Sequence, residues 1–151
     1  MTITVFSDEQ MKELGARCGA LVQGGEVFEL IGDIGAGKTT FTKGLARGLA
    51  ITDDVQSPTF TISRTYTGRD AIQLTHYDFY RLPDAGIMAD EIKEVMEDPK
   101  SVVVVEWSEV VAKVLPTDRI QMTIRPITES SREITLSAAG EKSQRLLEAL
   151  L

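Results

Sequence analysis

Apolar residues follow two different spacings along this chain, and together these spacings predict strands and helices in alternation. Runs such as EVFELI at residues 26–31 and SVVVV at 101–105 are typical of strands. Other stretches carry an apolar residue every three or four positions, as on one face of a helix. The predicted strands cover residues 2–6, 26–31, 56–66, 71–78, 101–105, 119–125 and 132–137. The predicted helices run from residue 7 to the glycines at 24–25, from the glycine-rich segment 32–39 to residues 48–51, over 83–100, and through Leu146, Leu147 and Leu150.

The first helix has a recognisable start and a recognisable apolar face. Ser7 and Gln10 form a capping-box pattern, in which both side chains satisfy opening backbone N–H groups. Met11, Leu14 and Cys18 follow at helical spacing, so we expect Cys18 to be a small core residue and not a nucleophile.

The strands are expected to form one mixed sheet. The four valines within residues 101–105 indicate a strand buried on both faces, which is typical of a sheet covered by helices. The strands at 56–66 and 71–78 are joined by a turn and predict a β-hairpin, and the last two strands are expected to be antiparallel. The pattern predicts an α/β fold of three layers with a mixed central sheet.

Composition narrows the class of protein. The chain has 151 residues, 42% of them hydrophobic, and we expect one domain over residues 1–151. A net charge of −7 argues against a large contact with DNA or RNA phosphates, so any RNA would be held by a partner. The single cysteine excludes an internal disulfide and a Cys/His zinc site. With no export signal or membrane-spanning run, a cytoplasmic protein is expected.

The segment Gly32–Thr39 matches the phosphate-binding loop G-x-x-x-x-G-K-[ST] between a strand and a helix. Its glycines allow backbone N–H groups to point at phosphates, and the helix adds its N-terminal dipole. Lys38 would reach the β- and γ-phosphates, and the Thr39 hydroxyl would bind Mg²⁺. A glycine-rich turn without a ligand is the alternative. The expected nucleotide contacts in this segment are Ile34, Gly35, Ala36, Gly37, Lys38, Thr39 and Thr40.

Two predicted strands end in a carboxylate, at Asp78 and at Glu106. In phosphate-loop enzymes such a residue holds the metal or its water, and either one could serve. Glu106 follows the valines, so its strand should lie inside the sheet and its carboxylate at the edge where ligands bind. We therefore favour Glu106 as the metal ligand, while Asp78 could hydrogen-bond a metal-bound water or orient the attacking water. Lys38 is the third expected catalytic residue. Solvated strand ends are the alternative.

Three further features are less specific. Ser57-Pro58-Thr59 lies where many phosphate-loop proteins keep a segment that senses the γ-phosphate, although a plain proline turn is also compatible with it. Trp107 either fills core space or lies near the nucleotide. His76, the only histidine, has no local Ser or Cys partner, so we expect it to be packed or hydrogen-bonded and assign it no catalysis.

Four segments occur together in the order and spacing of the TsaE family, formerly called YjeE, and the resemblance covers most of the chain. TsaE proteins are small bacterial ATPases needed for the threonylcarbamoyl modification of the adenosine beside the anticodon in tRNAs that read codons starting with A. The resemblance implies ATP and Mg²⁺ as cofactors and a complex of the TsaD and TsaB proteins as partner. The segments are GDIGAGKTT at 32–40, SPTF at 57–60, HYDFYRL at 76–82 and Glu106-Trp107.

The same resemblance implies roles for individual residues. Thr39 and Glu106 would bind Mg²⁺, residues 57–59 would form the first switch, and Asp78 matches a second acidic motif. The adenosine would lie between the start of the first helix and the C-terminal strand pair. Its implied contacts are Ser7, Glu9 and Arg132.

Two features depart from the family pattern, and other functions stay open. Ser108 stands where the family usually has proline, and residues 83–100 match less well.

A small kinase would need arginines on a closing lid, and 83–100 contains none. A GTPase would need the N-K-x-D motif, which the chain lacks. A nucleotide-gated binding module with negligible turnover is a further alternative.

Overall fold

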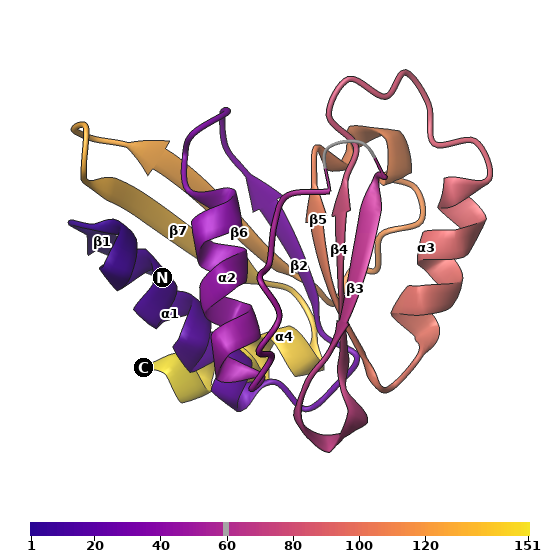
Figure 1. Ribbon diagram of the computed structural model, residues 1–151, viewed down its shortest axis with the longest axis horizontal. Coiled ribbons are helices and arrows are strands. Elements are labelled where there is room, and N and C mark those ends of the chain that lie inside the picture. Colours follow the sequence, from indigo (N-terminus) through magenta and orange to yellow (C-terminus); the bar gives the residue numbers. More distant parts are fainter. Residues whose placement is uncertain (59–60) are drawn as a thin grey trace.

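A seven-stranded mixed sheet forms the centre of the molecule, for which a computed structural model describes residues 1–58 and 61–151 (Figure 1). The strand order is β1-β7-β6-β2-β5-β4-β3. The four strands from β6 to β4 are mutually parallel, while β1, β7 and β3 pair antiparallel with their neighbours. The strands are β1 (Thr2–Val5), β2 (Val27–Ile31), β3 (Ser63–Thr67), β4 (Gln73–Asp78), β5 (Ser101–Glu106), β6 (Ile120–Pro126) and β7 (Arg132–Ala138).

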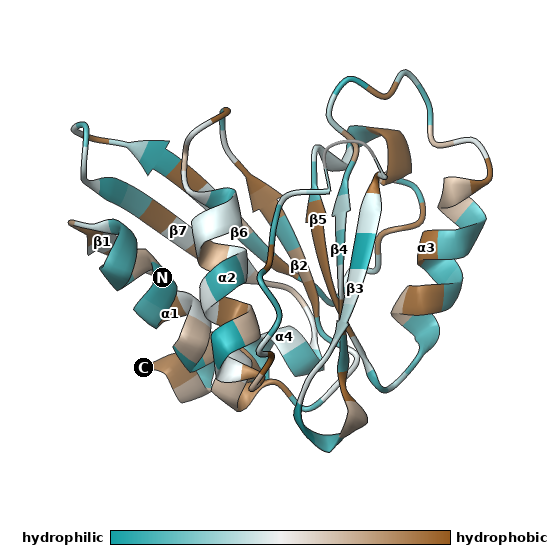
Figure 2. Ribbon diagram, in the orientation of Figure 1, coloured by the Kyte–Doolittle hydropathy of each residue, from teal (hydrophilic) through white to brown (hydrophobic). Residues whose placement is uncertain are grey.

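Helices lie on both faces of the sheet, which confirms the predicted three-layer α/β fold (Figure 1). Helices α1 (Asp8–Leu21), α2 (Lys38–Gly48) and α4 (Glu141–Leu150) share one hydrophobic cluster with the sheet. Helix α3 (Met88–Glu97) covers the opposite face, where Ile92 is buried. In Figure 2, α3 carries both hydrophilic and hydrophobic bands, in keeping with a helix that packs by one face only. No helix in the described ranges is long and apolar enough to span a membrane.

Strand β5 is buried along its whole length, as its valines predict. Val102 and Val104 belong to the cluster under α1 and α2, whereas Val103 and Val105 belong to the cluster under α3. The alternation follows from the two-residue repeat of a strand. Because β2 and β4 flank β5 in parallel, the last residue of β5, Glu106, emerges at the carboxyl edge of the parallel strands.

Helices α1 and α2 approach each other so closely that side chains are excluded from the contact. A Cβ atom added to Gly19 would lie 2.2 Å from the carbonyl oxygen of Leu45, and one added to Gly44 would lie 2.2 Å from that of Lys12. Such distances leave room only for glycine. The contact fixes α2, and with it the loop that precedes α2, against the sheet. The glycines at this crossing are Gly15, Gly19, Gly44 and Gly48.

The start of α1 and the place of Cys18 confirm the sequence predictions. Ser7 is the N-cap, and its hydroxyl accepts a hydrogen bond from the Gln10 N–H at 3.1 Å. The Gln10 side chain accepts from the Phe6 N–H at 2.8 Å, one residue earlier than in a standard capping box. Cys18 is 1% exposed, and burial raises its pKa to about 12, so its thiol is unreactive at neutral pH.

The strand predicted over 56–66 is wrong in its first part, since β3 begins at Ser63. Residues 56–58 and 61–62 lie outside the sheet, and residues 59–60 lie outside the described ranges. Ile62 has a φ of 66°, which no extended strand tolerates, and its N–H donates to the Pro58 carbonyl at 3.1 Å. A turn therefore stands where alternation alone predicts a strand.

Two other elements are shorter than predicted. The helix expected over 83–100 is α3, at Met88–Glu97. Gly86 has a φ of 52°, which a right-handed helix does not allow, so the helix begins only after it. The strand expected over 71–78 is β4 from Gln73, since Arg69–Ala71 form a short 3₁₀ helix, η1. A second one, η2, covers Ser108–Val111.

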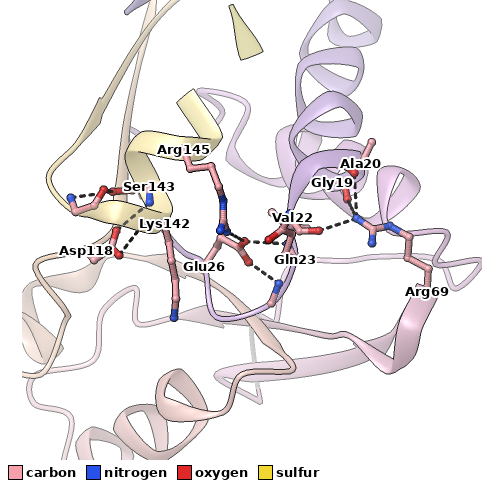
Figure 3. A network of polar contacts seen from close by, with 12 residues as sticks. Gly19, Ala20, Val22, Gln23, Glu26, Arg69, Asp118, Lys142, Ser143 and Arg145 are labelled. Carbon is pink, nitrogen blue, oxygen red and sulfur yellow. Dashed lines mark hydrogen bonds and ion pairs between the residues drawn. The ribbon is translucent and has the colours of Figure 1, made fainter. Parts of the chain in front are cut away.

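A polar network lies at the amino ends of the parallel strands, at the end of the sheet opposite the glycine-rich loop (Figure 3). The Arg69 guanidinium donates to the carbonyls of Gly19 and Val22, each at 2.8 Å, and so satisfies the end of α1. The buried Glu26 carboxylate accepts from the N–H groups of Gln23 and Gly24, also at 2.8 Å. These bonds hold the chain between α1 and β2 in place.

In the same network Asp118 caps the start of α4 from outside the helix (Figure 3). Its carboxylate accepts from the N–H groups of Lys142 and Ser143 at 3.0 and 2.9 Å. A Cβ atom on Gly140, the N-cap residue, would lie 2.4 Å from Asp118. Although burial opposes ionisation, the hydrogen bonds from Ser143 and Lys142 lower the pKa of Asp118.

Replacing Asp118 by alanine should lower the free energy of unfolding by about 1 kcal/mol, the usual scale for a lost helix cap. Because the folded pKa lies below the unfolded pKa, this stabilisation is complete above the unfolded pKa and is lost as pH falls through the folded one. Urea unfolding at neutral and acidic pH measures it. Asp118→Asn keeps an acceptor but loses the charge, so its stability at neutral pH should lie between those of the unmodified protein and Asp118→Ala. An alanine effect of equal size in acid would contradict this account.

Candidate functional site

A pocket of about 570 Å³ opens at the carboxyl edge of the parallel strands. This volume suits a small-molecule ligand. The pocket is lined by residues from the start of α1, the glycine-rich loop, the ends of β4 and β5, and the turn between β6 and β7. Its lining residues are Asp8, Ile34, Gly35, Gly37, Lys38, Thr39, Thr40, Ser57, Asp78, Tyr80, Glu106, Trp107, Glu129 and Arg132.

The glycine-rich loop connects β2 to α2 and turns at two glycines with positive φ. Gly35 has a φ of 78° and Gly37, the N-cap of α2, has a φ of 114°. Residues with a Cβ rarely adopt such angles, which explains the glycines. No side chain caps α2, so its first N–H groups remain available to an anion at the helix terminus.

The ammonium group of Lys38 is almost fully enclosed, with 6% of the residue exposed. Its Nζ donates to the Gly32 carbonyl at 2.6 Å and lies 3.8 Å from Oε1 of Glu106. It also lies 4.2 Å from the centroid of the Trp107 ring, a cation–π contact. A phosphate that enters the loop would compete with these three partners for Lys38.

The two strand-end carboxylates lie side by side but in different surroundings. Asp78 and Glu106 are register partners at the ends of β4 and β5. Glu106 is 3% exposed and lies between Lys38 and the ring of His76, which its Oε2 contacts. Asp78 is half-buried and accepts from the Ser57 hydroxyl at 3.2 Å and from the Tyr80 N–H at 3.0 Å. Glu106 therefore faces the lysine, and Asp78 faces the segment that contains Ser57.

The oxygen donors of the pocket fit Mg²⁺. Thr39 and Glu106 both line it, and a hydroxyl and a carboxylate are the ligand types that a small hard cation takes. In the described ranges, no group of three or more His, Cys, Asp and Glu side chains could hold a metal ion. Mg²⁺ commonly binds through one or two protein ligands and the phosphates of a nucleotide.

The residues implied as adenosine contacts are not all in the pocket. Arg132 lines it, and its guanidinium donates to the carbonyls of Ala36 and Thr128, both at 3.0 Å. This side chain thus ties the loop before α2 to the turn after β6. Ser7 caps α1, and Glu9 forms an exposed ion pair with Arg47 at 3.0 Å.

Some residues predicted as nucleotide contacts do not line the pocket, and some residues that line it were not predicted from the sequence. Ala36 is buried, is not part of the pocket lining, and accepts a hydrogen bond from Arg132 at its carbonyl. Thr59 lies outside the described ranges. Asp8 and Glu129 line the pocket, yet their place depends on the strand order, which no local pattern reveals. Tyr80 packs against Trp107 with ring centroids 4.9 Å apart; its position within the HYDFYRL segment was the available signal.

Ser108 fixes the chain that follows Trp107. Its hydroxyl donates to the buried Glu29 carboxylate at 2.6 Å. Arg119 and Gln121 donate to the other oxygen of Glu29 at 2.7 and 2.8 Å. Burial opposes the charge on Glu29, but the hydrogen bonds from Ser108, Arg119 and Gln121 outweigh it and lower its pKa. The serine thus gives the loop an anchor that proline could not provide.

Comparisons with known proteins agree on one family. The model of "Threonylcarbamoyl adenosine biosynthesis protein TsaE" matches residues 5–134. The chain is 40% identical over 146 residues to the tRNA threonylcarbamoyladenosine biosynthesis protein TsaE of Bacillus subtilis, covering 94% of this chain and 88% of that protein. For the protein of that name from Streptomyces coelicolor the identity is 39%, covering 87% and 93%. The crystal structure of Bacillus subtilis YdiB superposes with a TM-score of 0.82 at 34% identity, covering 99% of this chain and 93% of that one.

Because Trp107 is the only tryptophan and lies over Lys38, its fluorescence should report phosphate entering the loop. Titration with ATP should give a saturable change in emission, since a phosphate that draws Lys38 away alters the surroundings of the indole. Adenosine at the same concentrations is the matched control: it carries the base without phosphate, so it should give at most a small part of the change that ATP gives. An equal response to adenosine, or none to ATP, would show that Lys38 does not exchange its partners for phosphate.

Proposed function

This chain belongs to the TsaE family, a family of phosphate-loop ATPases, and we propose that it binds ATP with Mg²⁺ in the described pocket and hydrolyses it for tRNA threonylcarbamoyladenosine formation. One observation carries the proposal: the glycine-rich loop, the buried ammonium of Lys38 and the carboxylate of Glu106 meet in a pocket of nucleotide size. Phosphate binding, charge neutralisation and a metal ligand are thereby available in one place.

The phosphate chain is bound by the loop from Ile34 to Thr40. Backbone N–H groups at the start of α2 receive the β-phosphate, and Lys38 turns from the Gly32 carbonyl to the β- and γ-phosphate oxygens. Thr39 and Glu106 would hold Mg²⁺, which would supply positive charge against the phosphates. The enclosure of Lys38 lowers the local dielectric, so its charge acts on the phosphates more strongly than it would in water.

Asp78 and the segment at Ser57 complete the site. Asp78 borders the pocket beside Glu106, where its carboxylate orients the attacking water for in-line displacement. The hydrogen bond from Ser57 to Asp78 links the segment 57–59 to that water, so this segment reports whether the γ-phosphate is present.

The base of the nucleotide is placed between the start of α1 and the strands β6 and β7. Arg132 is the best supported contact, because it lines the pocket and a guanidinium plane can stack on adenine. Ser7 and Glu9 flank Asp8, which also lines the pocket, and they remain proposed contacts of the base. Trp107, which lies over Lys38, is proposed to contact the nucleotide near its phosphates.

The partner of the ATPase cycle is a complex of the TsaD and TsaB proteins, in the cytoplasm, with tRNA held by that complex. The net charge of −7 disfavours direct binding of tRNA. The pocket itself is lined by four carboxylates and only two cations, and the Arg132 cation is already bonded to carbonyls. Transition-state positive charge is therefore scarce in the isolated chain, and its hydrolysis is slow without the partner.

Exchanging each carboxylate for its amide tests their separate roles. Glu106→Gln should slow hydrolysis by about a hundredfold or more, the scale for losing a positioned charge, and should raise the Mg²⁺ concentration needed. Asp78→Asn should slow hydrolysis while leaving the Mg²⁺ dependence close to that of the unmodified protein. Steady-state rates over a range of Mg²⁺ concentrations measure both. If Asp78→Asn alters the Mg²⁺ dependence and Glu106→Gln does not, the roles are reversed.

Addition of the TsaD and TsaB proteins should raise ATP turnover. An arginine supplied by the partner would accelerate hydrolysis by about 10³ to 10⁵ with little change in ATP affinity. Rigidification of the site around Ser57 by the partner would instead tighten ATP binding together with the rate. Rates and ATP affinities measured with and without the pair distinguish the two routes. Fast hydrolysis by the isolated chain that ignores the pair would contradict partner activation.

A further inference from the structure

His76 lies directly behind the carboxylate of Glu106. It is on β4, two residues before Asp78, and it is completely buried. Its Nε2 contacts Oε2 of Glu106, while Oε1 of the same carboxylate faces the Lys38 ammonium at 3.8 Å. The two oxygens of Glu106 are thus divided between an interior partner and a partner in the pocket.

The other ring nitrogen of His76 determines which tautomer is present. Nδ1 is buried and has no hydrogen-bond partner among the described residues. A hydrogen on Nδ1 would be a buried donor without an acceptor, which native structures avoid. The ring hydrogen therefore belongs on Nε2, where it donates to the Glu106 carboxylate. The buried ring is absent from the pocket lining, so a direct role in proton transfer to a ligand is excluded by its position.

We propose that His76 is a positioning residue: with its ring hydrogen on Nε2 it holds Oε2 of Glu106 and keeps Oε1 turned toward Lys38 and the pocket. A carboxylate held at one oxygen loses rotational freedom about its terminal torsion. The contribution of His76 to Mg²⁺ binding rests on the proposed role of Glu106 as metal ligand. The contact between His76 and Glu106 and the position of the ring hydrogen do not depend on that role.

Nitrogen NMR of the ring tests the contact, and the assignment is immediate because the chain has one histidine. In ¹⁵N-labelled protein, Nε2 should show the shift of a protonated nitrogen and Nδ1 that of an unprotonated one. Glu106→Gln should move the Nε2 signal and its attached hydrogen. A protonated Nδ1, or a ring spectrum that ignores Glu106→Gln, would overturn the proposal.

A pair of variants tests the positioning effect. His76→Gln places an amide N–H at the same reach as Nε2, whereas His76→Phe keeps the ring and removes the donor. Loss of a hydrogen bond to a metal-binding carboxylate costs about 10- to 100-fold in metal affinity or activity. In the presence of ATP, His76→Phe should therefore need a roughly 10- to 100-fold higher Mg²⁺ concentration for half-saturation of the metal site. Its affinity for ATP measured in EDTA should be unchanged. His76→Gln should stay within a few-fold of the unmodified protein.

Further controls separate the possible failures. Thermal unfolding verifies that each variant is folded, and if His76→Phe is not, His76→Asn replaces it, because its amide is too short to reach Glu106. Equal Mg²⁺ binding by the Gln and Phe variants would overturn the positioning role. If the unmodified chain hydrolyses no ATP, the proposed function fails, while the NMR and Mg²⁺-binding measurements still test His76.

Discussion

The buried contact between Lys38 and Glu106 is the constraint on which the rest of the site depends. An ammonium and a carboxylate, 3.8 Å apart and both nearly inaccessible to water, are tolerable only as partners. Removing one partner of such a pair typically costs about 3–5 kcal/mol. The pair joins the first residue of α2 to the last residue of β5, so the phosphate loop can take its position only when the parallel strands are in register and α2 is seated on the sheet.

The surrounding structure holds these two charges in place from several directions. The glycines between α1 and α2 allow these two helices to approach closely and fix α2. His76 supports the carboxylate from the interior, and Trp107 covers the ammonium from the pocket side. Ser108 then anchors the chain after Trp107 to Glu29. Binding of a phosphate must therefore exchange existing contacts of Lys38 for new ones, and this exchange connects nucleotide binding to the position of Trp107.

Much of the fold could be predicted because the deciding signals are local. The phosphate loop, the valines of β5 and the cap at Ser7 each specify their element within a few residues. The carboxylates Asp78 and Glu106 could also be found from the sequence, since each ends a predicted strand and parallel strands bring their carboxyl ends together. Residues 56–58 and 61–62 could not, because Pro58 and the left-handed Ile62 override the alternation. The glycine contact and the lining by Asp8 and Glu129 depend on pairings between distant segments.

The central claim is that this pocket turns over ATP through the buried lysine. The most direct measurement is release of inorganic phosphate from ATP, with Mg²⁺ and the partner proteins present, by the unmodified chain and by Lys38→Ala, each verified as folded by circular dichroism. The account predicts sustained release by the unmodified chain and none above background by the variant. Equal release by the two proteins would contradict it.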